Sequence, residues 1–302
     1  MVVKTCVFIA NDAGKYAFEK MLNKGWIDAI ITIDKTKAEK LKVTNYFDIH
    51  NYNLSSIKVY KAKKYNLKSE EDIYNIKLLD CDIGFVLGWN RLIPKDILET
   101  FSIGVYGFHG TPFGLPVGRG RSPTIWTIAL GYDKFYLHLF RVAEGVDDGN
   151  IIDTQLIKIY STDDIKLFHM KTSYWAWRMI ERSYNKIING FKGIPQKGTP
   201  VYFRKRTEKD GKIRWNLSAE MIYNLVRAVT KPYPGAWTIY KGEKIRIWKV
   251  RIFDDENCSE VPGTICEVFD RAIPLVNTGR GSIVIEEYEP YMKLEEGEMF
   301  EQ

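Results

Sequence analysis

Short apolar runs alternate with polar segments of helical period through the first 160 residues. Residues 2–10 (VVKTCVFIA) and 82–89 (DIGFVLGW) are rich in β-branched and aromatic side chains, as buried strands are. Residues 14–25 have helical spacing and end at Gly25, which suits a helix C-cap. Further apolar runs complete the pattern at 27–33, 56–60, 103–109 and 135–142. Strands that alternate with helices predict an α/β fold with a mostly parallel sheet and helices on both faces.

The pattern changes after one long predicted helix at 163–190 and a linker rich in Pro and Gly at 190–203. A second helix is predicted at 218–229, with Ser218 as its N-cap. Five short strands, predicted within 236–240, 244–253, 263–269, 272–276 and 282–288, then follow at regular spacing. We therefore expect a Rossmann-like domain at 1–203 and a small C-terminal β-barrel domain, OB-like, at 204–302.

Composition fits an ordinary globular protein, with 45% hydrophobic and 27% charged residues in 302. No run of 18 apolar residues occurs, and the N-terminus shows no signal-peptide pattern, so we expect a cytoplasmic protein with no membrane partner. The four cysteines, Cys6, Cys81, Cys258 and Cys266, lack CxxC spacing and are expected to be buried reduced thiols without a metal.

The formal charge of +6 lies entirely in the N-terminal two thirds of the chain. Residues 204–302 hold 16 Lys+Arg and 17 Asp+Glu, a net charge of −1. Lysine-rich segments at 35–42 and 61–68 indicate solvated faces, with attraction of an anionic substrate as the weaker alternative. The charge pattern therefore gives no support for a nucleic-acid partner.

Two segments carry candidate chemistry. Residues 104–123 (GVYGFHGTPFGLPVGRGRSP) place His109 at the end of a strand, where it is suited to proton transfer, although a histidine there is more often merely packed or solvated. Residues 140–153 run from a strand into an acidic turn around Asp147, which alone would be an ordinary hairpin or a cation loop. The glycines of the first segment lack the GK[ST] of a phosphate-binding loop.

Together, the order His-Gly-Thr, Leu-Pro, Arg-Gly-Arg-x-Pro and Glu-Gly-x-Asp-x-Gly-x-Ile resembles that of the 10-formyltetrahydrofolate-dependent formyltransferases. Residues 206–215, 221–238 and 244–250 also look like the C-terminal part of two-domain members. The chain is most similar to the formyltransferase half of the bifunctional bacterial enzyme that formylates UDP-4-amino-4-deoxy-L-arabinose. The resemblance implies transfer of a formyl group to a nucleotide-linked amino sugar (UDP- or dTDP-linked), with a 4-amino group favoured over a 3-amino group, for lipopolysaccharide or surface-glycan biosynthesis.

The family carries a catalytic Asn, His and Asp, of which His109 and Asp147 match here. The Asn position is Gly107, and the following loop is about two residues longer than in the arabinose enzyme. In the family, the Asn amide donates a hydrogen bond to the oxygen of the tetrahedral intermediate. Loss of one such donor typically raises the activation barrier by about 2.7 to 4 kcal/mol. Candidates for a replacement donor are a cationic His109, Thr111 and Asn90.

The resemblance also implies the binding residues. For the 10-formyltetrahydrofolate co-substrate these are Leu87, Gly88, Trp89, Asn90, Val142, Glu144, Gly145 and Asp147. For the sugar nucleotide they are Asn11, Gly107, Gly110, Thr111 and Arg119. No metal is implied, and the aromatic C-terminal surface favours a homodimer.

Three alternatives remain open at this point. Methionyl-tRNA formyltransferase also has a C-terminal barrel, but that barrel should be basic, whereas residues 204–302 are near neutral. Glycinamide ribonucleotide formyltransferase lacks the second barrel. A non-catalytic folate- or sugar-nucleotide-binding protein would account for Gly107.

Overall fold

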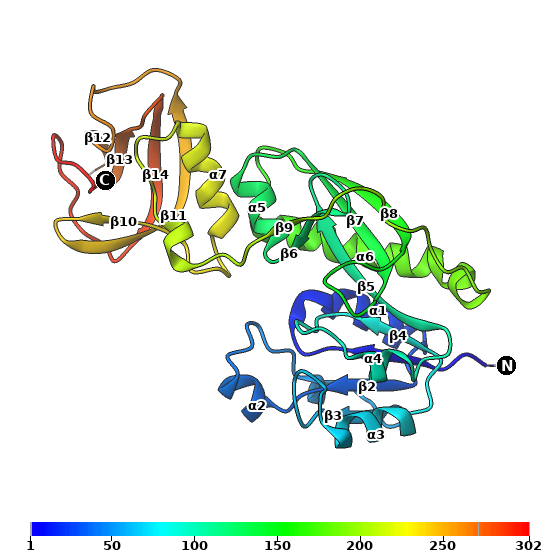
Figure 1. The fold of residues 1–302 in the computed structure, drawn as a ribbon. Helices are drawn as coiled ribbons and strands as arrows, with labels where there is room; N and C mark the ends of the chain where they lie inside the picture. The colour runs from blue at the N-terminus through cyan, green and yellow to red at the C-terminus, as the bar shows by residue number, and fades with distance from the viewer. Residues whose placement is uncertain (1, 271, 302) are drawn as a thin grey trace. The chain divides into compact units, whose positions relative to one another are not determined.

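The computed structural model describes residues 2–270 and 272–301, which form two compact units (Figure 1). Unit 1 comprises residues 1–120, 136–157 and 169–202, and unit 2 comprises residues 121–135, 158–168 and 203–302. Unit 2 thus takes in two segments that precede residue 203 in the chain. The predicted domain boundary at residue 203 stays a prediction.

A seven-stranded sheet organises unit 1, in the order β3-β2-β1-β4-β5-β7-β8. Its strands are β1 (Thr5–Phe8), β2 (Ala29–Thr32), β3 (Lys58–Lys61), β4 (Ile83–Val86), β5 (Gly104–Thr111), β7 (Lys134–Arg141) and β8 (Ile151–Lys158). The first five run parallel, and β7 pairs antiparallel with β5. The predicted α/β class and mostly parallel sheet are confirmed.

Short and long helices connect and cover these strands. They are η1 (Asp12–Gly14), α1 (Lys15–Asn23), α2 (Lys35–Lys40), η2 (Ile49–Asn51), α3 (Glu70–Leu78), α4 (Lys95–Leu98) and α6 (Ile165–Ile188), whereas α5 (Pro123–Ala129) belongs to unit 2. Cys6 and Phe8 of β1 share a hydrophobic cluster with Ile76 of α3 and Ile97 of α4. On the opposite face, Thr5 Oγ1 lies 3.0 Å from the hydroxyl of Tyr184 on α6. Helices therefore cover both faces, as the alternating pattern predicts.

Unit 2 is built on a five-stranded antiparallel sheet in the order β10-β11-β14-β13-β12. Its elements are η3 (Glu208–Gly211), α7 (Ala219–Val229), β10 (Ala236–Tyr240), β11 (Glu243–Asp254), β12 (Ile265–Phe269), β13 (Ile273–Asn277) and β14 (Ser282–Glu289). Ser218 caps α7 by accepting a hydrogen bond from the amide of Met221, as its sequence position predicts. Trp215 and Phe300 are buried and stacked 4.9 Å apart in the core of the unit.

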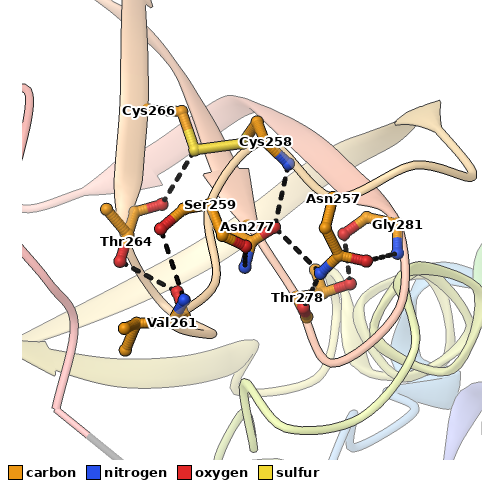
Figure 2. Close-up of a disulfide and its surroundings, with 9 residues drawn as sticks. All are labelled: Asn257, Cys258, Ser259, Val261, Thr264, Cys266, Asn277, Thr278 and Gly281. Atoms are coloured by element: carbon orange, nitrogen blue, oxygen red, sulfur yellow. Dashed lines mark hydrogen bonds between the residues drawn. A yellow bond between two sulfur atoms is a disulfide. The ribbon is translucent and has the colours of Figure 1, made fainter.

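The expectation of four reduced cysteines is wrong for one pair. Cys258 and Cys266 form a disulfide (Figure 2). Cys6 and Cys81 are free and buried, as expected. The turn before β12 brings the two Cα atoms within 6.2 Å, a separation that a disulfide spans. Eight residues of spacing do not reveal such a turn, so the sequence pattern alone could not predict the bond.

The loop that carries Cys258 is also held by side-chain amides. The buried Asn277 accepts a hydrogen bond from the Cys258 amide at 3.1 Å and donates one to the Ser259 carbonyl at 2.7 Å (Figure 2). Asn257 accepts one from the Gly281 amide at 3.0 Å. The disulfide therefore reinforces a loop that hydrogen bonds already hold.

Among the described helices, none is long and apolar enough to cross a membrane.

Candidate active site

His109 and Asp147 form a pair at the end of β5. His109 Nδ1 lies 3.3 Å from Asp147 Oδ2, although 38 residues separate the two in sequence, and His109 is only 8% exposed. The antiparallel pairing of β5 with β7 brings them together, because the turn with Asp147 directly follows β7. The resemblance had paired these two residues, and the fold places them in contact.

Both nitrogens of His109 face hydrogen-bond acceptors. Nε2 lies 2.8 Å from the carbonyl oxygen of Gly118, and Nδ1 faces the carboxylate of Asp147. A carbonyl oxygen can only accept, so Nε2 donates to Gly118. The carboxylate of Asp147 beside Nδ1 orients the ring and favours its positively charged form over an uncharged surrounding. To donate to a bound ligand through Nε2, the ring must first release the Gly118 carbonyl.

The Asp147 carboxylate is anchored by a short strand, β6 (Val117–Gly120), which pairs with β9 (Val201–Phe203). The amide of Gly120 donates to Asp147 Oδ2 at 3.0 Å. Two residues earlier on the same strand, Gly118 accepts from His109. One strand thus holds both members of the pair through its backbone.

A cavity of about 270 Å³ opens beside this pair, wholly within unit 1. Its walls come from the turn before α1, the segment that follows β4, the end of β5 and the acidic turn after β7. The lining residues include Ala13, Gly14, residues 86–93, Gly107, Phe108, Phe140, Val142, Gly145 and Asp147. Asp147 therefore borders both the cavity and His109.

Main-chain segments approach each other closely at two glycines that line the cavity. A Cβ at Gly14 would overlap the carbonyl oxygen of Leu87, so no other residue fits there without movement of the chain. At Gly88, φ is +122° and a Cβ would lie 2.6 Å from the carbonyl oxygen of Asn11. Both positions require glycine because β1 and β4 approach so closely at their carboxyl ends.

Seven of the eight residues predicted for the co-substrate line this cavity: Leu87, Gly88, Trp89, Asn90, Val142, Gly145 and Asp147. Glu144 does not line it. This side chain is exposed and lies 3.7 Å from the ammonium of Lys95. The assignment of all eight residues to a folate remains a prediction.

The five residues predicted for the sugar nucleotide are all buried, and three of them make side-chain hydrogen bonds within the protein. Gly107 lines the cavity, and a Cβ there would lie 3.2 Å from the Val142 methyl group. Asn11 caps η1 through its side-chain oxygen, and Gly110 is buried within β5. Thr111 is fully buried and its hydroxyl donates to the Val117 carbonyl at 2.7 Å. Of the candidate replacement donors, Thr111 is thus already engaged, whereas Asn90 lines the cavity.

Arg119 is 8% exposed, and its guanidinium reaches Gln196 of the linker rather than the cavity. Sequence reasoning treated this linker as a connection only and did not single out Gln196.

Sequence reasoning also missed His138, which lies opposite His109 in the β5–β7 register and is 4% exposed. The alternation of residues along the strand at 135–142 was the only signal for His138, and it could not reveal the partner strand.

Burial, and secondarily the neighbouring His109, lower the pKa of His138 to about 4. Its Nε2 accepts a hydrogen bond from the Leu115 amide at 3.2 Å, and Nδ1 lies 2.9 Å from the Thr154 hydroxyl. The neutral ring therefore supports the loop between His109 and β6.

Within residues 2–270 and 272–301, no cluster of three or more His, Cys, Asp and Glu side chains could hold a metal ion.

Comparisons with known proteins agree with this architecture. The family described as formyl transferase, C-terminal domain, matches residues 205–297. Bifunctional polymyxin resistance protein ArnA of Wigglesworthia glossinidia brevipalpis is 31% identical over 274 residues, which cover 87% of this chain and 40% of that protein. Methionyl-tRNA formyltransferase of Pelotomaculum thermopropionicum is 29% identical over 213 residues, which cover 70% of this chain and 67% of that protein.

A solved structure extends the likeness over both units. The N-formyltransferase from Helicobacter canadensis, in complex with folinic acid and dTDP-3-aminofucose, matches with a TM-score of 0.65 at 18% identity, covering 94% of this chain and 99% of that one. At this identity the match shows the fold alone. The sequence relatives show that the chain is similar to formyltransferases over most of its length, as the motif order predicts. The chain spans 40% of the length of the ArnA relative.

Proposed function

We propose that this protein transfers a formyl group from 10-formyltetrahydrofolate to the amine of a nucleotide-linked amino sugar. The observation that carries the proposal is the His109–Asp147 pair at the border of the cavity, in a chain similar to formyltransferases over most of its length. The catalytic domain would be residues 1–203, and the C-terminal domain residues 204–302. We propose a cytoplasmic enzyme, and homodimerisation stays a prediction.

The cavity suits the folate co-substrate on two grounds. First, its wall from 86 to 93 combines apolar side chains with backbone groups, the mixture that flat heterocycles bind. Second, the indole nitrogen of Trp89, a lining residue, is buried without a hydrogen-bond partner among the described residues. Such donors are rare in folded proteins, and a slight rotation of Trp89 would offer this one to an acceptor of the ligand.

10-Formyltetrahydrofolate supplies the formyl carbon: the amine nitrogen bonds to it, the bond to N10 breaks, and the proton lost by the amine balances the one gained by N10. Asp147 holds His109 at one nitrogen, and Gly118 orients the ring at the other. With Nε2 released from Gly118, His109 would donate a hydrogen bond that stabilises negative charge developing on the formyl oxygen, the role that the family's asparagine plays. Asp147, which borders the cavity, would take the proton of the amine.

An amino sugar is favoured over tRNA by charge. Residues 204–302 carry a net charge of −1, which gives little attraction for an RNA backbone. Tight binding of initiator tRNA in a gel-shift assay at physiological salt would contradict this choice. The resemblance to the arabinose enzyme favours a 4-amino over a 3-amino sugar, and the nucleotide stays open between UDP and dTDP.

A mass-spectrometric screen tests the proposal. The purified protein is incubated with 10-formyltetrahydrofolate and a panel of UDP- and dTDP-linked 3-amino and 4-amino sugars, and a gain of one formyl group is sought. His109→Ala and Asp147→Asn serve as controls and should abolish the gain. Tight binding of folate and sugar nucleotide without turnover on any acceptor would instead support a non-catalytic binding protein, the alternative that Gly107 raises.

A further inference from the structure

The turn that carries Asp147 is tight. Asp147 has a φ of +51°, in the left-handed region that aspartate tolerates better than most side chains. Gly149, two residues on, has no room for a Cβ because the carbonyl oxygen of Arg141 occupies that position. Hydrogen bonds from outside the turn also hold its backbone.

Gln196 of the linker provides that support through its side-chain amide. Its Nε2 donates to the carbonyl oxygens of Asp147 and Gly149, both at 2.8 Å. These two bonds use both hydrogens of the side-chain amide and connect Asp147 to Gly149, two residues further along the turn. The segment from 190 to 203 thus does more than connect two regions of the chain.

Arg119 fixes the orientation of this amide. Its Nη2 and Nε donate to Gln196 Oε1 at 2.7 and 3.2 Å. Because a guanidinium can only donate, the oxygen of Gln196 must face Arg119 and the nitrogen must face the turn. The other recorded partner of the guanidinium among the described residues is the hydroxyl of Tyr202, at 3.5 Å.

Arg119 also sits between the two residues that hold the catalytic pair by their backbone. Gly118 accepts from His109, and Gly120 donates to Asp147. The side chain of Arg119 adds a third connection, through Gln196, to the backbone of Asp147. One short strand thereby sets the positions of both members of the pair by three routes.

We propose that Arg119 and Gln196 are positioning residues that act as one relay to hold Asp147 against His109. This inference rests on the proposed function, and it replaces substrate binding as the role of Arg119. A buried guanidinium whose donors are directed at a neighbouring amide is poorly placed to bind a ligand in the cavity. Loss of the relay should change the rate of the chemical step more than substrate affinity.

The kinetic test uses Gln196→Ala, Gln196→Met, Arg119→Lys and the double variant Arg119→Lys/Gln196→Ala. Each single variant should lower kcat by roughly 10- to 100-fold, since small misplacements of catalytic groups have effects of this size, while KM changes by less than about threefold. The double variant should be no slower than Gln196→Ala, because both changes break the same relay.

Gln155 offers a matched control. It also accepts from an arginine, Arg182 Nη1 at 3.0 Å, and donates to a backbone carbonyl, that of Leu156 at 2.9 Å. It makes no recorded contact with the catalytic pair. Gln155→Ala should keep wild-type kcat and KM. A loss of activity in that variant would show that breaking any arginine–glutamine hydrogen bond lowers activity, which would contradict a specific role for Gln196.

A second measurement does not depend on activity. The Gly120 amide is bonded to Asp147 Oδ2, so its hydrogen exchange reports how firmly the carboxylate is held. Exchange should accelerate by about tenfold in Gln196→Ala, the effect of losing one net hydrogen bond, and stay unchanged in Gln155→Ala. Inactivity of the wild-type protein on every acceptor would sink the proposed function, while this exchange measurement would still test the relay.

Two results would overturn the relay. One is a large rise in the KM of the sugar nucleotide for Arg119→Lys at unchanged kcat, with Gln196→Ala like wild type, which would make Arg119 a ligand contact. The other is wild-type exchange of the Gly120 amide in both Gln196 variants.

Discussion

His138 should make the stability of this protein depend on pH in the acidic range. The buried ring has a pKa of about 4 in the folded protein, against its usual 6.5 in an unfolded chain. Between these two values the unfolded chain binds a proton that the folded protein does not. Stability that is fully present above pH 6.5 is therefore lost as the pH falls toward 4.

The size of this effect follows from the difference between the two pKa values. About 2.5 units at 1.36 kcal/mol each correspond to roughly 3 kcal/mol of unfolding free energy. The structure gives the cause, because Nε2 of His138 accepts from the Leu115 amide and cannot do so once it is protonated. The ring is 4% exposed, so solvent offers no replacement partner.

Urea unfolding measures this pH dependence of the free energy of unfolding. It is carried out between pH 7.5 and 4.5 and followed by tryptophan fluorescence and circular dichroism. His138→Gln removes the titrating group and leaves an oxygen that can accept from Leu115. The stability difference between wild type and this variant should therefore shrink or reverse by about 2.5 kcal/mol between pH 7.5 and 4.5. Thr154→Val is the matched control: it removes the partner of Nδ1 but should keep the wild-type pH dependence. A difference between wild type and His138→Gln that stays constant with pH, or a measured His138 pKa above 6, would refute the reasoning.

Three further predictions concern the catalytic pair, the missing asparagine and the disulfide. His109→Ala and Asp147→Asn should each lower kcat by about 10² to 10⁴ with smaller effects on binding, since they remove proton transfer, and single-turnover kinetics with calorimetry would separate the two. Gly107→Asn should lower activity, because a Cβ there already meets a valine methyl at 3.2 Å; a large rate increase at unchanged affinity would instead show that the site merely lacks an oxyanion donor. Replacing Cys258 and Cys266 by serine should cost about 2 to 3 kcal/mol of stability in urea unfolding, the loop-entropy effect for so short a loop, with activity retained.

Elements that depend on local pattern could be predicted from the sequence. Apolar runs marked strands β1, β2, β4 and β5, because a parallel strand that is buried on both faces reads as a continuous apolar run. Ser218 marked the start of α7 because an N-cap acts within three residues. The motif order also located His109 and Asp147, since their separation along the chain is a family property.

Features that depend on the meeting of distant segments could not be predicted. Gln196 looks like any polar linker residue until the linker lies against the turn of Asp147. His138 looks like a strand residue until β7 pairs with β5. Glu144 shows the converse: its motif position implied a ligand contact, but the turn directs the side chain outward, toward Lys95.

Two glycines in the wall of the cavity restrict how this site can diversify. Gly14 and Gly88 bring main chain against main chain, so substitutions there cannot reshape the pocket without separating β1 from β4. Variation in what the pocket accepts must then come from the other lining residues, among them the segment 89–93 and the turn that carries Asp147. A laboratory selection for new acceptor amines should accumulate its changes at those residues and leave both glycines untouched.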